Sequence, residues 1–309
     1  MQSSPLTLRR VFVPLVTPFT EDGQIDVPAL EKLTHRVVEA NASPFILGTT
    51  GEYASLSRKK RTQVVKTVCE VSRGKQPVFA GISGTCMEES LETAEEYTQL
   101  GVHAVVAHPP GYYPIGGTEM QMYFTLLADR LPVPLLLYNI PVTTHHSIPL
   151  SVVEALSHHP NIIGIKDSER DEARLREAVA LFRERPDFAH LTGWGARIGN
   201  ALRWGSRGMV PGTGNVIPGL YHQMLIAADR EDWEVVEHLQ KISDRVSALY
   251  QSQRRLSQAL AALKVILHQM GLCAPHVLPP LIPCSEEEAR SIGQQFREIK
   301  QEWPEFFSS

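Results

Sequence analysis

The chain has 309 residues, of which 43% are hydrophobic and 21% charged, and its formal net charge is −4. This length allows one large α/β barrel or two ordinary domains with a sizeable core. The slightly acidic balance argues against nucleic acid as a partner and gives no attraction to anionic lipid. No apolar stretch approaches the ~18 residues of a membrane span, and Met1–Pro5 lack the pattern of a signal peptide, so we expect a cytoplasmic protein with no membrane partner.

Cysteine and histidine spacing gives no sign of a metal centre. Neighbouring histidines stand side by side rather than at the i, i+4 spacing of a helical zinc site, and neighbouring side chains diverge in direction. The cysteines lack metal-ligand and redox spacings, which predicts reduced thiols and no metal. The four are Cys69, Cys86, Cys273 and Cys284.

Short apolar, β-branched runs alternate with longer helical patterns, at spacings of roughly 30 residues, the length of one strand–helix unit. Eight such units predict a (β/α)₈ barrel, whose buried parallel strands are continuously apolar. A doubly wound fold is disfavoured because no glycine-rich dinucleotide turn follows the first run. The runs begin near Val11, Phe45, Val78, Ala104, Leu135, Ile162, His190 and Gly208.

Helix signals fall between these runs. Asp26 followed by Pro28 predicts an N-cap with proline in the first turn. Thr85 and Glu88 have the spacing of a capping box before a helix that ends near Gly101. One apolar stripe at i, i+3, i+4 and i+7 predicts the buried face of a further helix. It consists of Leu175, Ala178, Val179 and Phe182.

The barrel pattern ends near Asp229, so we predict a barrel over 1–230 and a helical extension over 231–309 that packs on it as one structural unit. Ser285 and Glu288 have capping-box spacing at the start of the last helix, and Gly271 is a candidate C-cap for the one before it. The apolar residues of that earlier helix are expected to lie on one face. Its residues are Leu256, Leu260, Leu263, Leu267 and Met270.

The strand-end lysine Lys166, in the run Ile162–Ser168, is the strongest candidate for chemistry. Burial disfavours the ammonium and lowers the pKa of a lysine, and a neutral amine can form a Schiff base with a carbonyl. The alternative is a lysine whose stem packs while its head reaches water. Tyr138 ends the preceding strand, so the two residues should lie on neighbouring strand ends about 5 Å apart. A phenol there can pass protons to and from the carbonyl oxygen, which favours the catalytic interpretation.

Other strand ends supply further candidates, because barrel chemistry occurs where strands end and loops begin. Thr49 and Thr50, between glycines, can direct hydroxyl and N–H groups towards a carboxylate. Glu52, two residues on, is expected to be solvated or to cap a helix.

Aromatic and glycine-rich strand ends complete the set. Tyr112 and Tyr113 follow the fourth strand and lie either at the pocket or packed over the rim or across a subunit interface. Gly193 follows the seventh strand and Gly212 the eighth. A glycine-rich eighth strand end binds phosphate in many barrels. No lysine or arginine follows locally here, so we prefer an interpretation in which these glycines leave room for substrate.

Four motifs in this order make the chain resemble the dihydrodipicolinate synthase / N-acetylneuraminate lyase family of pyruvate-dependent class I aldolases. They are Gly-Thr-Thr-Gly-Glu at 48–52, the tyrosine pair at 112–113, Tyr-Asn-Ile-Pro at 138–141 and Gly-Ile-Lys-Asp at 164–167.

The resemblance implies a role for each matched residue. Lys166 would form the Schiff base with pyruvate or another 2-oxo acid, and Tyr138 would be the proton shuttle. Thr49 and Thr50 would hold the carboxylate or complete the proton relay. One tyrosine of the pair would come from a neighbouring subunit, with Tyr112 the match and Tyr113 the fallback. No cofactor is implied, and the assembly would be a homotetramer built from dimers.

Departures from the family pattern bear on the second substrate. The synthase has an arginine two residues after the Tyr-Asn-x-Pro motif, where this chain has Thr143, which lacks the charged bidentate clamp. The sialic-acid lyases carry an acidic pair after the seventh strand, where this chain has Gly195 and Ala196.

We therefore expect a lyase acting on pyruvate and an aldehyde, of the 2-keto-3-deoxy sugar acid or 4-hydroxy-2-oxoglutarate type. A dihydrodipicolinate synthase with a replacement for the arginine is the alternative. A non-catalytic 2-oxo acid sensor is the third hypothesis. The resemblance also places Thr143, Gly193 and Gly212 among the residues that would contact substrate.

Overall fold

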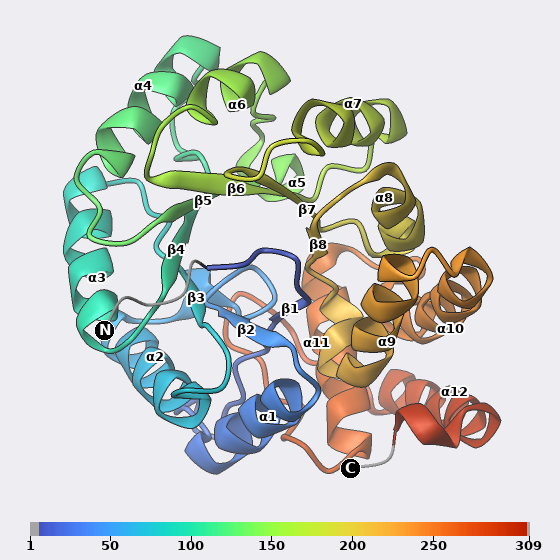
Figure 1. Cartoon of the computed structure of the whole chain (residues 1–309). Coiled ribbons are helices and arrows are strands. Elements are labelled where there is room, and N and C mark those ends of the chain that lie inside the picture. The colour runs from blue at the N-terminus through green and yellow to red at the C-terminus, as the bar shows by residue number, and fades with distance from the viewer. Residues whose placement is uncertain (1–5, 308–309) are drawn as a thin grey trace.

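The computed structural model describes residues 6–307, in which eight parallel strands form a central barrel surrounded by helices (Figure 1). The strands pair in sequence order, and a parallel bridge between Val11 and Met209 joins the last strand to the first. This confirms the (β/α)₈ prediction, and each strand begins within two residues of the predicted start. The strands are β1 Phe12–Pro14, β2 Ser43–Ile46, β3 Phe79–Gly81, β4 Ala104–Ala107, β5 Leu135–Asn139, β6 Ile162–Asp167, β7 Ala189–Thr192 and β8 Gly208–Met209.

Nine helices among the described residues connect or follow the strands, and three more form the C-terminal extension. The first group is α1 Val27–Glu39, α2 Arg58–Ser72, α3 Met87–Gln99, α4 Gly117–Ala128, α5 Pro141–Thr144, α6 Leu150–Leu156, α7 Glu172–Phe182, α8 Ile198–Trp204 and α9 Pro218–Asp229. The extension is α10 Trp233–Gln251, α11 Leu256–Gln269 and α12 Glu286–Glu302.

Two of the three predicted helix starts are confirmed. Asp26 caps α1 by accepting a hydrogen bond from the Ala29 N–H at 3.1 Å, and Ser285 caps α12 by accepting from the Glu288 N–H at 3.2 Å. The predicted cap at Thr85 is wrong, because α3 begins at Met87 and Cys86 occupies the N-cap without a side-chain hydrogen bond. The capping-box pattern therefore places the N-cap of α3 one residue too early.

The core has two layers on either side of the barrel wall. Aromatic and aliphatic side chains fill the barrel interior, and a second layer lies between the strands and the helices. The predicted stripe on α7 is buried in that second layer, as expected. On the apolar face predicted for α11, Leu263 and Leu267 are buried, whereas Leu256 is exposed. Further apolar residues of α11 are also buried, because the helix packs against α10 and α12.

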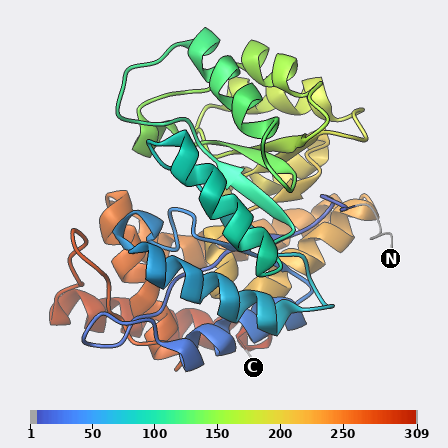
Figure 2. The ribbon, with the colours of Figure 1, turned by 90° about the vertical axis from the view of Figure 1, so that its left-hand side faces the viewer.

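In the C-terminal extension, α10 packs on α8 and α9, and α11 and α12 pack on α10 (Figure 1). Figure 2 shows the extension on the same side of the molecule as α1. The Tyr250 hydroxyl on α10 lies 3.0 Å from the Thr213 hydroxyl in the turn after β8, so the extension contacts a strand end. The boundary predicted at 230/231 falls between α9 and α10 and stays a prediction. No described helix is long and apolar enough to cross a membrane. Residues 1–5, which entered the prediction of location, lie outside the described part.

Candidate active site

Lys166 lies inside the barrel near the end of β6 and is 4% exposed. Its Nζ lies 3.9 Å from the centroid of the Tyr138 ring and 4.4 Å from that of Phe45. Burial lowers the pKa of Lys166, and interaction with Tyr138 opposes that shift without cancelling it. No carboxylate within residues 6–307 forms an ion pair with this amine. In these surroundings a lysine populates its neutral form more readily than in water, and the neutral amine is the nucleophile.

Tyr138 stands beside Lys166 because β5 and β6 pair in parallel with these two residues as direct partners. Both side chains therefore point to the same face, the barrel interior. The Tyr138 hydroxyl lies 3.4 Å from the Thr49 hydroxyl, at the long end of hydrogen bonding. Lysine, phenol and a threonine hydroxyl thus converge from β6, β5 and the turn after β2. The sequence left Thr49 and Thr50 open for this relay, and the threonine that lies at Tyr138 is Thr49.

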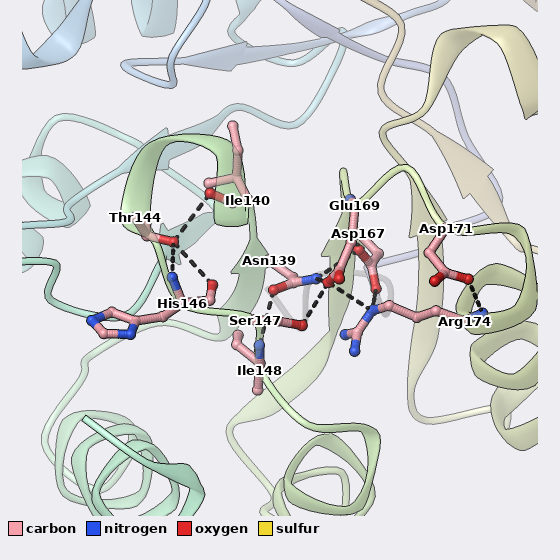
Figure 3. A network of polar contacts seen from close by, with 10 residues as sticks. All are labelled: Asn139, Ile140, Thr144, His146, Ser147, Ile148, Asp167, Glu169, Asp171 and Arg174. Carbon is pink, nitrogen blue, oxygen red and sulfur yellow. Dashed lines mark hydrogen bonds and ion pairs between the residues drawn. The ribbon is translucent and has the colours of Figure 1, made fainter. Parts of the chain in front are cut away.

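The next residue of each strand points outward and fixes this register (Figure 3). Asn139 Nδ2 donates to Asp167 Oδ1 at 2.9 Å and to Glu169 Oε2 at 2.8 Å. Arg174 Nε donates to Asp167 Oδ2 at 2.8 Å, in a largely buried ion pair. Asn139 Oδ1 accepts from the Ile148 N–H at 3.0 Å. The network ties the ends of β5 and β6 together directly behind Tyr138 and Lys166.

The Gly48–Glu52 turn forms the third side of the site. Its backbone is closed by hydrogen bonds from the Gly51 N–H to the Gly48 carbonyl and from the Glu52 N–H to the Thr49 carbonyl, both at 3.1 Å. The Thr17 hydroxyl donates to the Gly51 carbonyl at 2.7 Å. The turn is therefore held both by its own backbone hydrogen bonds and by Thr17, in the loop after β1.

Glu52 corrects one expectation. It is neither solvated nor a side-chain cap, because its side chain is fully buried and forms an ion pair with Lys264 of α11, Nζ to Oε1, at 2.5 Å. Its partner lies more than 200 positions further along the chain, so local sequence reasoning had no access to it.

Tyr53 and His108 are site-proximal residues that sequence reasoning missed. The Tyr53 hydroxyl hydrogen-bonds the His108 Nε2, and the His108 ring lies 6.4 Å from the Tyr138 ring, centroid to centroid. Burial lowers the pKa of His108. His108 follows β4 directly, so its strand-end position is a signal that could have identified it.

Tyr112 and Tyr113 point to solvent within this chain, being 77% and 70% exposed, and their rings pack edge to face at 5.0 Å. The loop that carries them is fixed in part by His146, whose Nε2 lies 2.9 Å from the Tyr113 carbonyl oxygen. Their predicted part in the site would need a second subunit and stays a prediction.

The remaining predicted residues lie on loops after β5, β7 and β8. Thr143 is exposed, and its hydroxyl donates to the Ile140 carbonyl at 3.2 Å. Gly193 lies so close to Ser168 that a Cβ there would sit 2.1 Å from the serine Oγ, which explains the glycine sterically. A Cβ on Gly212 would lie 3.1 Å from the Tyr250 hydroxyl. Their contact with substrate stays a prediction.

The described part of the chain contains no cluster of three or more His, Cys, Asp or Glu side chains placed to hold a metal ion. All four cysteines are free thiols. Burial raises the pKa of Cys69 to about 12 and that of Cys273 to about 11, which makes both poor nucleophiles.

Known proteins of similar sequence cover nearly the whole chain. The model of the dihydrodipicolinate synthetase family matches residues 7–299. An uncharacterized DapA-like lyase of Thermofilum pendens is 28% identical, over 94% of this chain and 96% of its own length. The 4-hydroxy-tetrahydrodipicolinate synthase of Pseudoalteromonas atlantica is 31% identical, over 93% of this chain and 96% of its own length.

Two solved structures are similar to this chain over nearly its whole length. The dihydrodipicolinate synthase of Bacteroides thetaiotaomicron superposes with a TM-score of 0.89 at 32% identity, covering 95% of this chain and 99% of that one. YagE, a prophage protein of E. coli that belongs to the dihydrodipicolinic acid synthase family and was solved with pyruvate, has a TM-score of 0.89 at 26% identity, covering 96% and 99%. The chain therefore belongs to the dihydrodipicolinate synthetase family of aldolases and lyases.

Proposed function

We propose that this protein is a Schiff-base-forming lyase that joins or cleaves pyruvate and an aldehyde. The single observation that carries the proposal is the buried amine of Lys166 paired across the strands with Tyr138. Membership of the family and the pyruvate bound to YagE support it. The aldehyde would come from a 2-keto-3-deoxy sugar acid or a 4-hydroxy-2-oxoglutarate type of substrate.

In the cleavage direction, the neutral Lys166 amine attacks the 2-oxo carbon while Tyr138 protonates the carbonyl oxygen, which gives a carbinolamine. Loss of water leaves a protonated imine. Removal of the proton from the 4-hydroxyl then breaks the C3–C4 bond, the aldehyde departs, and the electron pair moves into the imine to form an enamine. Protonation at C3 and hydrolysis release pyruvate and free Lys166.

The carboxylate of the 2-oxo acid would be held at the Thr49–Thr50 turn, whose hydroxyl and N–H groups can donate to it. The Thr49 hydroxyl, which lies 3.4 Å from the Tyr138 phenol, would also pass a proton to Tyr138. Tyr112 of a neighbouring subunit would extend the relay in a homotetramer, with Tyr113 the alternative.

Borohydride reduction in the presence of pyruvate tests the proposal. The intact mass should rise by one reduced pyruvate adduct, mapped to Lys166 and absent from Lys166→Ala. Lys264 is an internal control, since it is also buried but is held by Glu52 as an ion pair. No adduct, or an adduct that persists in Lys166→Ala, would refute the Schiff-base mechanism.

A dihydrodipicolinate synthase is the second candidate, because several relatives carry the name 4-hydroxy-tetrahydrodipicolinate synthase. Thr143 stands against it, since a neutral hydroxyl replaces the charged clamp for a second carboxylate. Parallel assays with aspartate semialdehyde and with sugar-acid aldehydes separate the two. Adduct formation without turnover of any aldehyde would instead favour a 2-oxo acid sensor.

A further inference from the structure

A second buried lysine connects the C-terminal extension to the turn that would hold the carboxylate. Lys264 is 1% exposed, and its Nζ lies 2.5 Å from Glu52 Oε1, 2.8 Å from the His276 carbonyl oxygen and 4.0 Å from the centroid of the Phe19 ring. The second oxygen, Glu52 Oε2, accepts from the Leu278 N–H at 3.0 Å. The Glu52 carboxylate therefore binds both α11 and the segment that follows it.

Glu52 is also an unusual position in the backbone. Its φ is 56°, in the left-handed region that residues with a Cβ rarely adopt. Its N–H donates to the Thr49 carbonyl at 3.1 Å, so the orientation of Glu52 is coupled directly to Thr49. Backbone of this kind persists where the surrounding contacts over-determine it, and here they include the contacts of the Glu52 side chain with the extension.

A buried ion pair is a poor device for stability alone, because well-packed apolar residues often replace such a pair without loss. What the pair supplies is a fixed orientation of the Glu52 side chain. Lys264 of α11 fixes one carboxylate oxygen, and the Leu278 N–H in the segment that follows fixes the other. The backbone N–H of the same Glu52 closes the turn. The extension thus contacts the site through Glu52, on the side of the barrel where α11 lies (Figures 1 and 2).

We propose that Glu52 and Lys264 are positioning residues, through which the C-terminal extension holds the Thr49–Thr50 turn in the orientation that binds the carboxylate of the 2-oxo acid. The inference rests on the proposed function, and it assigns the extension a part in substrate affinity. Neither side chain touches the substrate; both act through the backbone of the turn.

Borohydride trapping with increasing pyruvate tests the inference without knowledge of the aldehyde. The variants are Glu52→Gln, Lys264→Met and the double variant. We expect the half-saturating pyruvate concentration to rise about tenfold in each single variant, with the trapped fraction at saturation close to that of the wild type. Because the two residues act as one unit, the double variant should be no worse than the more affected single variant.

Arg254→Met is the matched control, since Arg254 forms a partly buried ion pair with Glu288 inside the extension, 2.8 Å apart, away from the turn. It should lower the melting temperature and leave the half-saturating pyruvate concentration unchanged. If Lys264→Met does not fold, the double variant is measured in its place, because it leaves no unpaired buried charge.

Two results would overturn the inference. One is a half-saturating concentration within twofold of the wild type in the Glu52 and Lys264 variants. The other is an equal rise in Arg254→Met, which would assign the effect to general loosening of the extension. Absence of any adduct in the wild type would instead refute the proposed function, so the two failures are distinguishable.

Discussion

Lys166, at the scale of a single residue, shows how burial of a candidate catalytic group opposes stability. Its amine is buried among aromatic rings within the barrel, where the charged form loses hydration. The same burial that makes the amine nucleophilic therefore costs folding free energy. Functional residues of this kind are typical places where replacement stabilises a protein and abolishes its activity.

Lys166→Met should raise the free energy of unfolding by about 1–2 kcal/mol near neutral pH while removing the pyruvate adduct. The sign of its pH dependence follows from linkage. The pKa of Lys166 is lowered in the folded state, so the unfolded chain binds the extra proton, and wild-type stability rises with pH between the folded pKa and the ordinary lysine value. The advantage of the variant should therefore shrink as pH rises towards that value.

Denaturant unfolding at several pH values measures this difference. Lys59→Met, at an exposed lysine on α2, is the control and should show no such pH-dependent gain. An advantage for Lys166→Met that grows with pH would contradict the account.

His190 on β7 predicts sensitivity to acid. It is buried, its Nδ1 lies 3.0 Å from the Ser206 Oγ, and its Nε2 has no hydrogen-bond partner among the described residues. Burial lowers the pKa of His190 to about 4, below the usual value of 6.5. As the pH falls, His190 is therefore protonated at a higher pH in the unfolded state than in the folded state. Stability should fall as pH drops from 6.5 towards 4.

His190→Gln should flatten the stability profile in that window, measured by denaturant midpoints at a series of pH values. A profile as steep as that of the wild type would mean that other groups cause the acid sensitivity. The adduct yield at neutral pH serves as the control for an intact site.

At the scale of elements, the pairing of β5 with β6 is what makes a site from two residues in different units. Tyr138 and Lys166 face inward as register partners, and Asn139 and Asp167 face outward as hydrogen-bonded partners. A shift of one residue would exchange the two faces. The outward network in Figure 3 therefore stabilises the register that makes Tyr138 and Lys166 partners.

Arg174→Met tests that network. It leaves the Asp167 carboxylate buried without its cation, and breaking a buried pair in this way should cost about 3 kcal/mol of unfolding free energy. Arg290→Met is the control, because its pair with Glu286 is exposed and should contribute less than about 0.5 kcal/mol. Equal losses in the two variants, by denaturant unfolding, would rule out a special role for the network.

At the scale of the whole molecule, the Tyr112 and Tyr113 rings are exposed in one chain. The proposed homotetramer would bring one of them to the site of a neighbouring copy. Tyr112→Phe should fold normally, because its side chain is mostly in solvent in one chain, and should lower turnover if the phenol acts across an interface. Light scattering on the wild type would establish whether the predicted homotetramer exists.

Complementation makes the prediction specific. Tyr112→Phe and Lys166→Ala are each expected to be poorly active, but co-expressed mixtures should recover activity, because a Lys166→Ala subunit donates its intact Tyr112 to its neighbour. Reciprocal sharing in a two-fold dimer predicts recovery at about a quarter of the sites. No recovery would place the phenol of each chain in its own site or outside catalysis; Tyr113→Phe is tested in the same way.

Much of this architecture could be predicted from the sequence. The eight runs were locatable because buried parallel strands are continuously apolar, and Lys166 stood out because a charge ends one of them. Tyr138 followed from strand order, since consecutive units of a barrel are neighbours. The helix caps at Asp26 and Ser285 are local and were predictable for that reason, whereas the start of α3 was misplaced by one residue.

Only the tertiary structure decided what joins distant parts of the chain. The Glu52–Lys264 pair and the contact of Tyr53 with His108 each connect residues whose separation leaves no periodic signal. The sequence by itself determined which strand ends carry reactive side chains, because burial and alternation act locally. Strand order also brought Tyr138 and Lys166 together. What holds these side chains in place depends on packing between distant segments, which is a property of the folded molecule alone.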